Sequence, residues 1–170
     1  MNEKEITKLV ISELDSLGLI KKNNNTFKNT ESMLYSYNKI KESIKQRKTQ
    51  IKDLKKYGIP KKSKSIVSMS DNSIKLEEND ILDNTIKNIE KSIIKTKVVL
   101  KYIDHILFKL RNDDYYSIIE LKYFKNKTVE EIAEILEKDV STVSRNKNRL
   151  INEIKIYLLP NDVISDILGY

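Results

Sequence analysis

The sequence Thr128-Val-Glu-Glu-Ile-Ala-Glu-Ile-Leu-Glu-Lys-Asp-Val-Ser-Thr-Val-Ser-Arg145 predicts two helices separated by a very short turn. Thr128 and Glu131 form a capping box, the pattern in which an N-cap hydroxyl and a carboxylate three residues later satisfy the first backbone N–H groups of a helix. The following apolar residues predict a helix with one buried face over residues 129–136. Two helices that cross closely need a small residue at their contact, and Ala133, the only alanine of the chain, lies there.

Asp139 is placed to cap the second of these helices, which we expect from Val140 to about Leu158. A projection at about 100° per residue separates an apolar face from a polar face. The residues expected to point inward are Val143, Leu150, Ile154 and Leu158. Those expected to point outward are Ser141, Arg145, Asn148 and Asn152, flanked by Ser144, Arg149 and Lys155.

The outward face carries hydrogen-bonding groups and not the alternating Glu and Lys of an ordinary solvated helix. Arginine can read guanine edges in the major groove, asparagine can read adenine, and serine or lysine can hold phosphates. A codon bias toward Lys and Asn is the alternative origin of such a face. We interpret the face as a surface that binds double-stranded DNA.

Three consecutive segments resemble region four of bacterial sigma factors, the helix-turn-helix that reads the −35 promoter element and touches the polymerase flap. They are Glu120-Leu-Lys-Tyr-Phe124, Thr128 to Leu136, and Asp139 to Arg145. No segment resembles the sigma region that melts the −10 element. A long helical hairpin before such a module is instead similar to phage late-transcription regulators of the ArpU and RinA type, and Asn29-Thr-Glu-Ser-Met-Leu-Tyr-Ser-Tyr37 resembles the opening of the ArpU-like hairpin.

The resemblance implies a DNA-binding activator of phage or prophage late genes, with RNA polymerase as a second candidate partner. The residues that the resemblance and the helical projection assign to DNA are Thr128, Val140, Ser141, Thr142, Ser144, Arg145, Asn148, Arg149, Asn152 and Lys155. Three residues depart from the family pattern. Glu137 stands where many such turns have Gly, so the turn avoids positive φ or carries strain; Lys138 and Asn146 replace residues that are usually apolar.

Upstream of this module we predict three helices. The first covers residues 3–17 and stops at Gly18. The second starts at Asn29 or Thr30, both suitable N-caps, covers 30–57 and stops at Gly58. The third covers 79–110, after a loop over 58–78. Apolar residues in alternating steps of four and three predict that the second and third helices pair as an antiparallel hairpin. Pairing positions whose numbers sum to about 143 places the only polar residues of the two seams, Arg47 and Thr96, opposite each other.

The third predicted helix has a wider apolar stripe than one partner needs, because Ile94, Val98, Val99 and Ile106 extend it. Two arrangements would bury this stripe. Residues 3–17 of the same chain could pack on it, or a second copy of the chain could do so in a homodimer.

Composition supports an all-α fold, because 170 residues contain only 3 Gly and 2 Pro, fewer than sheets and their turns require. The absence of Cys excludes disulfides and Cys-based metal sites and is typical of a reducing compartment, so we expect a cytoplasmic protein without membrane segments. His105 is the only histidine, and no phosphate-binding loop or metal-ligand cluster is recognisable, so we expect neither an enzyme nor a cofactor.

Charge is unevenly distributed along the chain, whose formal net charge is +7. Residues 113–170 hold 8 basic and 11 acidic groups, yet residues 141–155 alone hold 4 basic and 1 acidic group. Positive charge within the C-terminal part is therefore concentrated on the expected DNA-reading helix, as binding to phosphates requires.

We divide the chain into a helical region at 1–112 with hairpin arms at about 30–57 and 79–111, a helix-turn-helix domain at 113–159, and a tail at 160–170. Two other functions fit the pattern. One is a small-terminase-like DNA-packaging protein, although such proteins usually carry the module near the N-terminus. The other is a helical adaptor that binds polymerase or another protein and not DNA.

Overall fold

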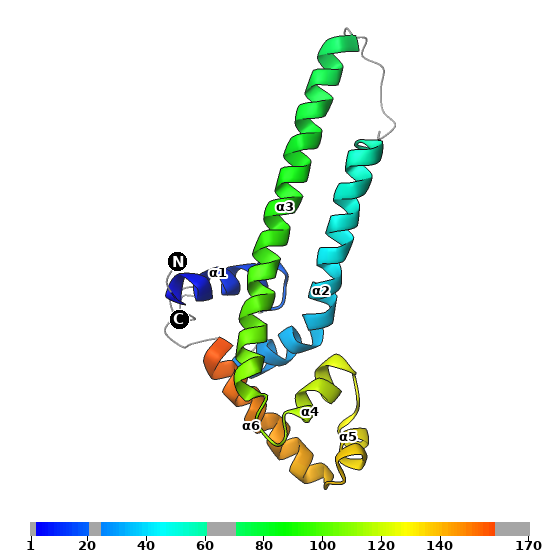
Figure 1. The fold of residues 1–170 in the computed structure, drawn as a ribbon. Helices are drawn as coiled ribbons and strands as arrows, with labels where there is room; N and C mark the ends of the chain where they lie inside the picture. Colours follow the sequence, from blue (N-terminus) through cyan, green and yellow to red (C-terminus); the bar gives the residue numbers. More distant parts are fainter. Residues whose placement is uncertain (1–2, 21–24, 61–70, 159–170) are drawn as a thin grey trace. The chain divides into compact units, whose positions relative to one another are not determined.

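The computed structural model describes residues 3–20, 25–60 and 71–158, and these residues form an all-α protein with no strand among them (Figure 1). The chain divides into two compact units. The first combines Met1–Ile40 with Val98–Tyr170, and the second is Lys41–Lys97. The predicted division between residues 112 and 113 therefore falls inside the first unit. Within the described ranges, no helix has the length and apolar character needed to cross a membrane.

Helix α1 spans Glu3–Ser16, close to the predicted range. Gly18 takes a positive φ of 69° beyond its end. Its N–H donates to the Asp15 carbonyl, and the Leu19 N–H reaches back to the Leu14 carbonyl, 2.9 Å away. This is the Schellman arrangement, which satisfies the last carbonyls of a helix and favours glycine at the left-handed position.

Helix α2 spans Thr26–Tyr57 and begins earlier than the predicted start at residue 29 or 30. The side chain of Asn25 accepts a hydrogen bond from the Lys28 N–H at 2.9 Å and so provides the N-cap. Asn29 and Thr30, which the sequence offered as caps, are buried in the first turns, and the Thr30 hydroxyl donates to the Thr26 carbonyl. The C-terminal end agrees with the prediction.

Helix α3 spans Asp71–Leu110, so the predicted loop over 58–78 is wrong for residues 71–78, which are helical. Residues 61–70 of that loop lie outside the described residues. The helix begins earlier because no Gly or Pro occurs between residues 61 and 159, and lack of apolar periodicity alone does not end a helix. Its end at Leu110 agrees with the sequence.

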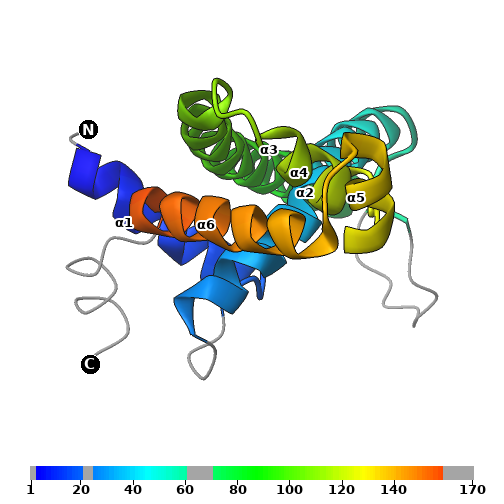
Figure 2. The same ribbon diagram turned by 90° about the horizontal axis from the view of Figure 1, so that it is seen from below.

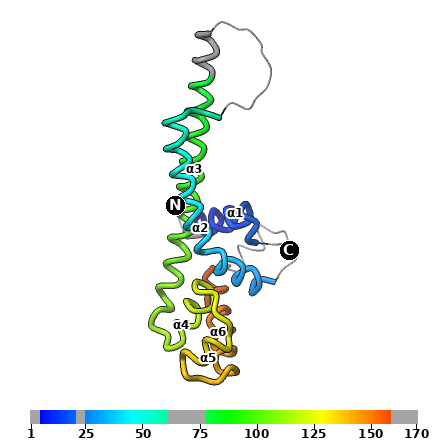
Figure 3. The backbone as a smooth tube through the Cα atoms, turned by 90° about the vertical axis from the view of Figure 1, so that its right-hand side faces the viewer, coloured from blue at the N-terminus to red at the C-terminus, as the bar shows by residue number. Residues whose placement is uncertain are grey.

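In the second unit, α2 and α3 lie side by side and run in opposite directions (Figure 3). Ile44 and Leu54 of α2 and Ile86 and Ile93 of α3 are buried in their seam. Arg47 Nη1 donates to Thr96 Oγ1 at 2.9 Å, which confirms the predicted pairing of the two polar seam residues.

In the first unit, the apolar stripe of α3 is covered by the chain itself. Val99 is fully buried and Ile106 nearly so. The hydroxyls of Thr7 in α1 and Tyr102 in α3 lie 3.2 Å apart, which places α1 beside this part of α3. Intramolecular packing thus accounts for much of the stripe, whereas Ile94, in the second unit, is exposed.

Four further elements complete the first unit. They are α4 at Ser117–Ile119, the π-helical turn η1 at Glu120–Phe124, α5 at Val129–Leu136 and α6 at Val140–Leu158 (Figure 2). The helical path ends after η1, where Asn126 takes a φ of 55°. Their shared core contains Ile118, Ile132, Ala133 and Val143.

Candidate nucleic-acid interface

Helix α5 begins with the capping box that its sequence predicts. The Thr128 hydroxyl accepts from the Glu131 N–H at 3.2 Å, and the Glu131 carboxylate accepts from the Thr128 N–H at 2.7 Å. Lys127 Nζ lies 2.7 Å from Glu131 Oε1, and its hydrogen bond is the main reason that the pKa of Glu131 is lowered. The N-terminus of α5 therefore already holds a carboxylate, which competes there with a phosphate.

The turn between α5 and α6 uses a glutamate in the left-handed conformation. Glu137 has φ 52° and ψ 47°. Its N–H donates to the Glu134 carbonyl, and the Lys138 N–H donates to the Ala133 carbonyl at 3.0 Å, which is a Schellman arrangement without glycine. Of the two alternatives for Glu137, the turn takes the strained one.

Ala133 lies in the contact that the sequence assigned to it. It is buried in one cluster with Val143 of α6 and Ile118 of α4. Its methyl group leaves the space that lets α5 and α6 approach each other. The α5 backbone thus sets the position of the first turn of α6.

The buried side of α6 is wider than predicted. Val143, Leu150, Ile154 and Leu158 are buried as expected, but Ile151 is also fully buried. The reason is that α6 packs on more than α4 and α5, since the Tyr102 hydroxyl of α3 donates to the Tyr157 carbonyl at 2.9 Å. The additional contact leaves a narrower outward surface.

The outward row of α6 is exposed along its length and consists of Ser141, Arg145, Asn148 and Asn152, as predicted. Val140 is 45% exposed at the first turn, and Thr128 is exposed at the start of α5. The other residues assigned to DNA are only partly accessible: Thr142, Ser144, Arg149 and Lys155.

Arg149 is engaged within the protein. Its two terminal nitrogens each lie 2.8 Å from an oxygen of Asp113, and Nη1 also lies 2.8 Å from Glu153 Oε1. The hydrogen bond from Arg149 is the largest cause of the lowered pKa of Asp113. Arg149 therefore fixes α6 to the segment before α4, a role that its spacing on the helix did not indicate.

A second polar cluster joins the beginning of α2 to η1 and α6. Glu31 Oε1 accepts from the Tyr123 hydroxyl at 2.7 Å and from Lys147 Nζ at 3.1 Å. The Tyr37 and Phe124 rings stack at 4.8 Å, and Asn38 Nδ2 donates to the Phe124 carbonyl. The segment that resembles the opening of an ArpU-like hairpin thus packs on the C-terminal helices, and sequence spacing gave no signal for this packing.

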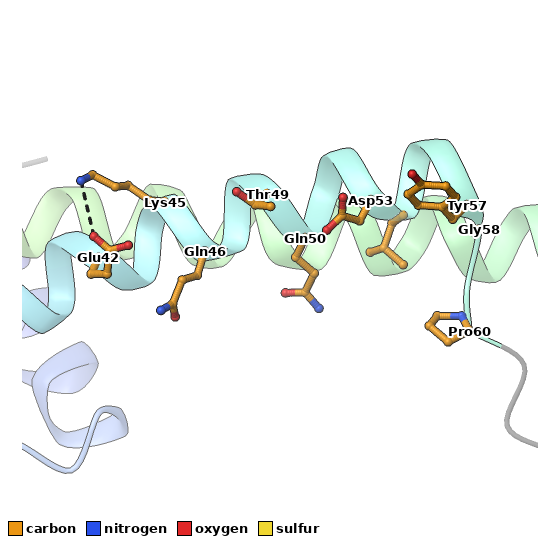
Figure 4. A pocket seen from close by; sticks show the side chains of 10 residues that line it. Glu42, Lys45, Gln46, Thr49, Gln50, Asp53, Tyr57, Gly58 and Pro60 are labelled. Carbon is orange, nitrogen blue, oxygen red and sulfur yellow. Dashed lines mark ion pairs between the residues drawn. The ribbon is translucent and has the colours of Figure 1, made fainter.

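Two of the hollows on the described surface border α5 and α2. One, of about 710 Å³, borders the α5–α6 turn and includes the acidic residues Glu130, Glu134, Glu137 and Asp139 in its lining. The other, of about 530 Å³, lies along α2 between Glu42 and Pro60 (Figure 4). Among the residues that the structure describes, no group of three or more His, Cys, Asp or Glu side chains is arranged so that it could hold a metal ion.

Comparison with protein-family models, curated proteins and solved structures finds no match.

Proposed function

We propose that this protein is a sequence-specific regulator of transcription that binds double-stranded DNA, with α5 and α6 as its helix-turn-helix and α6 in the major groove. The observation that carries the proposal is the exposed row of Ser141, Arg145, Asn148 and Asn152 on a helix whose other side is buried. A recognition helix needs both properties, because base-reading groups must be presented at fixed positions.

Arg145 has the central role in this proposal. It is exposed, and it is the only charged residue of the outward row. A guanidinium can donate two hydrogen bonds to O6 and N7 of guanine, which is the commonest specific contact in the major groove. Asn148 and Asn152 can each pair with adenine in the same way, and Ser141 can hold a phosphate beside the bases.

The ion pairs that Arg149 forms within the protein exclude this residue from the DNA-contacting surface. Since its guanidinium is paired with Asp113 and Glu153, its contribution to DNA binding is to hold α6 in place rather than to contact phosphate. The exposed carboxylates of Glu130, Glu134 and Glu137 make the α5 surface unfavourable for phosphates. Attraction to DNA within these helices is thus concentrated on α6.

The resemblance to sigma region four and to ArpU- and RinA-type regulators supports a regulator of phage or prophage late genes, with RNA polymerase as a second partner and the cytoplasm as its location. The two other candidate functions, a terminase-like packaging protein and a protein-binding adaptor, would give different footprints. Footprinting on late-promoter DNA, with and without polymerase, would show promoter-specific protection for the regulator, protection near packaging genes for a terminase-like protein, and no protection for an adaptor.

The decisive experiment concerns Arg145. A duplex site is first selected from a random DNA library with the full chain. Replacement Arg145→Ala should weaken binding to that site by about 1 to 3 kcal/mol and relax the preference at one guanine. Replacement of Lys155, a partly exposed lysine of the same helix that was assigned to phosphate, by Ala should lower affinity for all sequences equally. Unchanged selectivity in the Arg145 variant would refute the assignment of α6 as the reading helix.

A further inference from the structure

The α2 surface of the second unit carries lysines in a strict pattern. Its seam residues are Ile40, Ile44, Arg47, Ile51 and Leu54, and the residue immediately after each of them is a lysine. These five residues, here called the lysine row, are Lys41, Lys45, Lys48, Lys52 and Lys55. The intervening positions between 41 and 55 hold Glu42, Ser43, Gln46, Thr49, Gln50 and Asp53.

General lysine richness of the chain does not account for this pattern. Between residues 41 and 55, lysine occupies every position that follows a seam residue and none of the six other non-seam positions; Lys39 and Lys56 adjoin this stretch on either side. Steps of four and three residues keep the five side chains on one side of the helix. In Figure 4, Lys45 lies on the other edge of α2 from Gln46 and Gln50. The row is therefore one-sided, and all five lysines are exposed.

The row is also not matched by a row of opposite charge. The corresponding positions of α3, each one residue after a seam residue, are Asp83, Lys87, Glu90, Ile94 and Lys97, with two acidic and two basic groups. From 41 to 57, α2 holds seven basic and two acidic residues, whereas α3 holds four of each from 78 to 97. Like charges three and four residues apart destabilise a helix. Glu42 pairs with Lys45 at 3.4 Å, but both side chains are largely exposed, so this pair offsets little of the cost and the row as a whole costs free energy in the isolated protein.

A polyanion with regularly spaced charges would offset this cost. The row extends over fifteen residues of α2, so its ends lie about 21 Å apart at about 1.5 Å per residue. Double-stranded DNA presents one negative charge per about 1.7 Å of axis, and lysine binds phosphate as a flexible point charge. A membrane fits less well, because the apolar side of this helix, with Ile44 and Leu54, is buried against α3 and cannot enter a bilayer.

We propose that the lysine row is a second DNA contact, which binds the phosphate backbone of double-stranded DNA without regard to sequence. The inference rests on the proposed function, since it assigns the same ligand to a different surface. The row would supply sequence-independent affinity, while α6 supplies selectivity.

The test uses the full chain, a duplex of arbitrary sequence and a series of salt concentrations. Replacement of Lys48, Lys52 and Lys55 by Gln should weaken binding and reduce the slope of log affinity against log salt by about 0.9 for each phosphate that the protein no longer neutralises. Gln has nearly the helix propensity of Lys, and circular dichroism would verify the helix content. Replacement of the same three residues by Arg should restore the slope.

The matched control replaces Lys87, Lys91 and Lys95 of α3 by Gln. These residues are exposed, belong to the same unit and give the same change in net charge. The control should retain the wild-type slope. An equal loss in the control would show a general charge effect and overturn the proposal, as would an unchanged slope in the α2 variant or tighter lysine-dependent binding to single-stranded RNA than to the duplex.

Failure of the two DNA proposals can be told apart. If the wild-type chain selects a site through Arg145 but the α2 variant binds arbitrary duplex normally, only the lysine row is refuted. If the wild-type chain binds arbitrary duplex through the row but selects no site, only the assignment of α6 is refuted.

Discussion

Arg149 in the middle of α6 holds Asp113 through two parallel hydrogen bonds of 2.8 Å each. The pair joins the proposed recognition helix to the segment that enters α4. Both side chains are partly exposed, at 40% for Arg149 and 22% for Asp113, so solvent screens their attraction. The main consequence of the pair is geometric, because a planar guanidinium and a carboxylate fix each other in one orientation.

Replacement Arg149→Met should therefore lower the free energy of unfolding only modestly, by about 1 kcal/mol, since a partly exposed bidentate pair is removed. It should also weaken DNA binding although Arg149 does not contact the DNA, because α6 is less firmly held. Urea denaturation and binding to a selected site would measure the two effects. Replacement Arg145→Met should lower binding without the loss of stability; the reverse pattern would contradict both assignments.

The same pair predicts a dependence on pH. Arg149 holds the pKa of Asp113 below its ordinary value of about 3.9. A lowered folded-state pKa stabilises the fold above the unfolded-state pKa, and the contribution is lost as pH falls through the folded-state value. The difference in stability between wild type and Arg149→Met should thus be constant from about pH 5 to 7 and shrink below about pH 4. A difference that grows on acidification would be incompatible with this pair.

The left-handed Glu137 at the end of α5 predicts a stabilising substitution. A residue with a Cβ costs roughly 1 kcal/mol or more in this conformation, and glycine avoids the cost. We expect Glu137→Gly to raise the free energy of unfolding. The gain is smaller than the relieved strain, because glycine also gives the unfolded chain more conformational freedom. Lys138→Gly is the control, because Lys138 has no positive φ and should only lose stability. Thermal denaturation of both variants would decide, and destabilisation by both would show that Glu137 is not strained.

Local patterns predicted much of the fold, and contacts between distant segments account for most of the differences. The capping box at Thr128, the stop at Gly58 and the burial of Ala133 follow from residues within a few positions of each other. Glu31 and Lys147 are 116 positions apart, and nothing in either neighbourhood indicates their ion pair. Arg149 shows the same limit, since its helical spacing assigned it to DNA whereas Asp113, 36 residues away, holds it in the protein.

The hydrogen bond between Arg47 and Thr96 predicts that replacing both residues destabilises the protein less than replacing Thr96 alone. Thr96 is fully buried, accepts from Arg47 and donates to the Ser92 carbonyl. Thr96→Val alone removes a partner from a half-buried guanidinium and should be destabilising. Combined with Arg47→Leu it gives an apolar seam, so the double variant should be more stable than Thr96→Val. Chemical denaturation of the four proteins in the cycle would measure the coupling; additive effects would show that the bond contributes nothing.

The phenol of Tyr123 predicts how the stability of the first unit changes at high pH. Its ring is buried, and its hydroxyl donates to Glu31. Burial, followed by the hydrogen bond and the charge of Glu31, raises the pKa of Tyr123 above its ordinary value. In the unfolded chain the phenol ionises near pH 10. The stabilisation that depends on this proton is therefore fully present below about pH 10 and is lost as pH rises further.

Replacement Tyr123→Phe keeps the ring and removes the titrating hydroxyl. Near pH 8 it should lower the free energy of unfolding by about 1 kcal/mol, the usual net value of one hydrogen bond, because Glu31 retains its pairing with Lys147. Above about pH 10 the wild type should lose stability faster than the variant, so the two curves of stability against pH converge. Tyr57→Phe is the control, because Tyr57 is 72% exposed and should leave the curve unchanged. Parallel curves for wild type and Tyr123→Phe would show that the Tyr123 proton does not stabilise the fold.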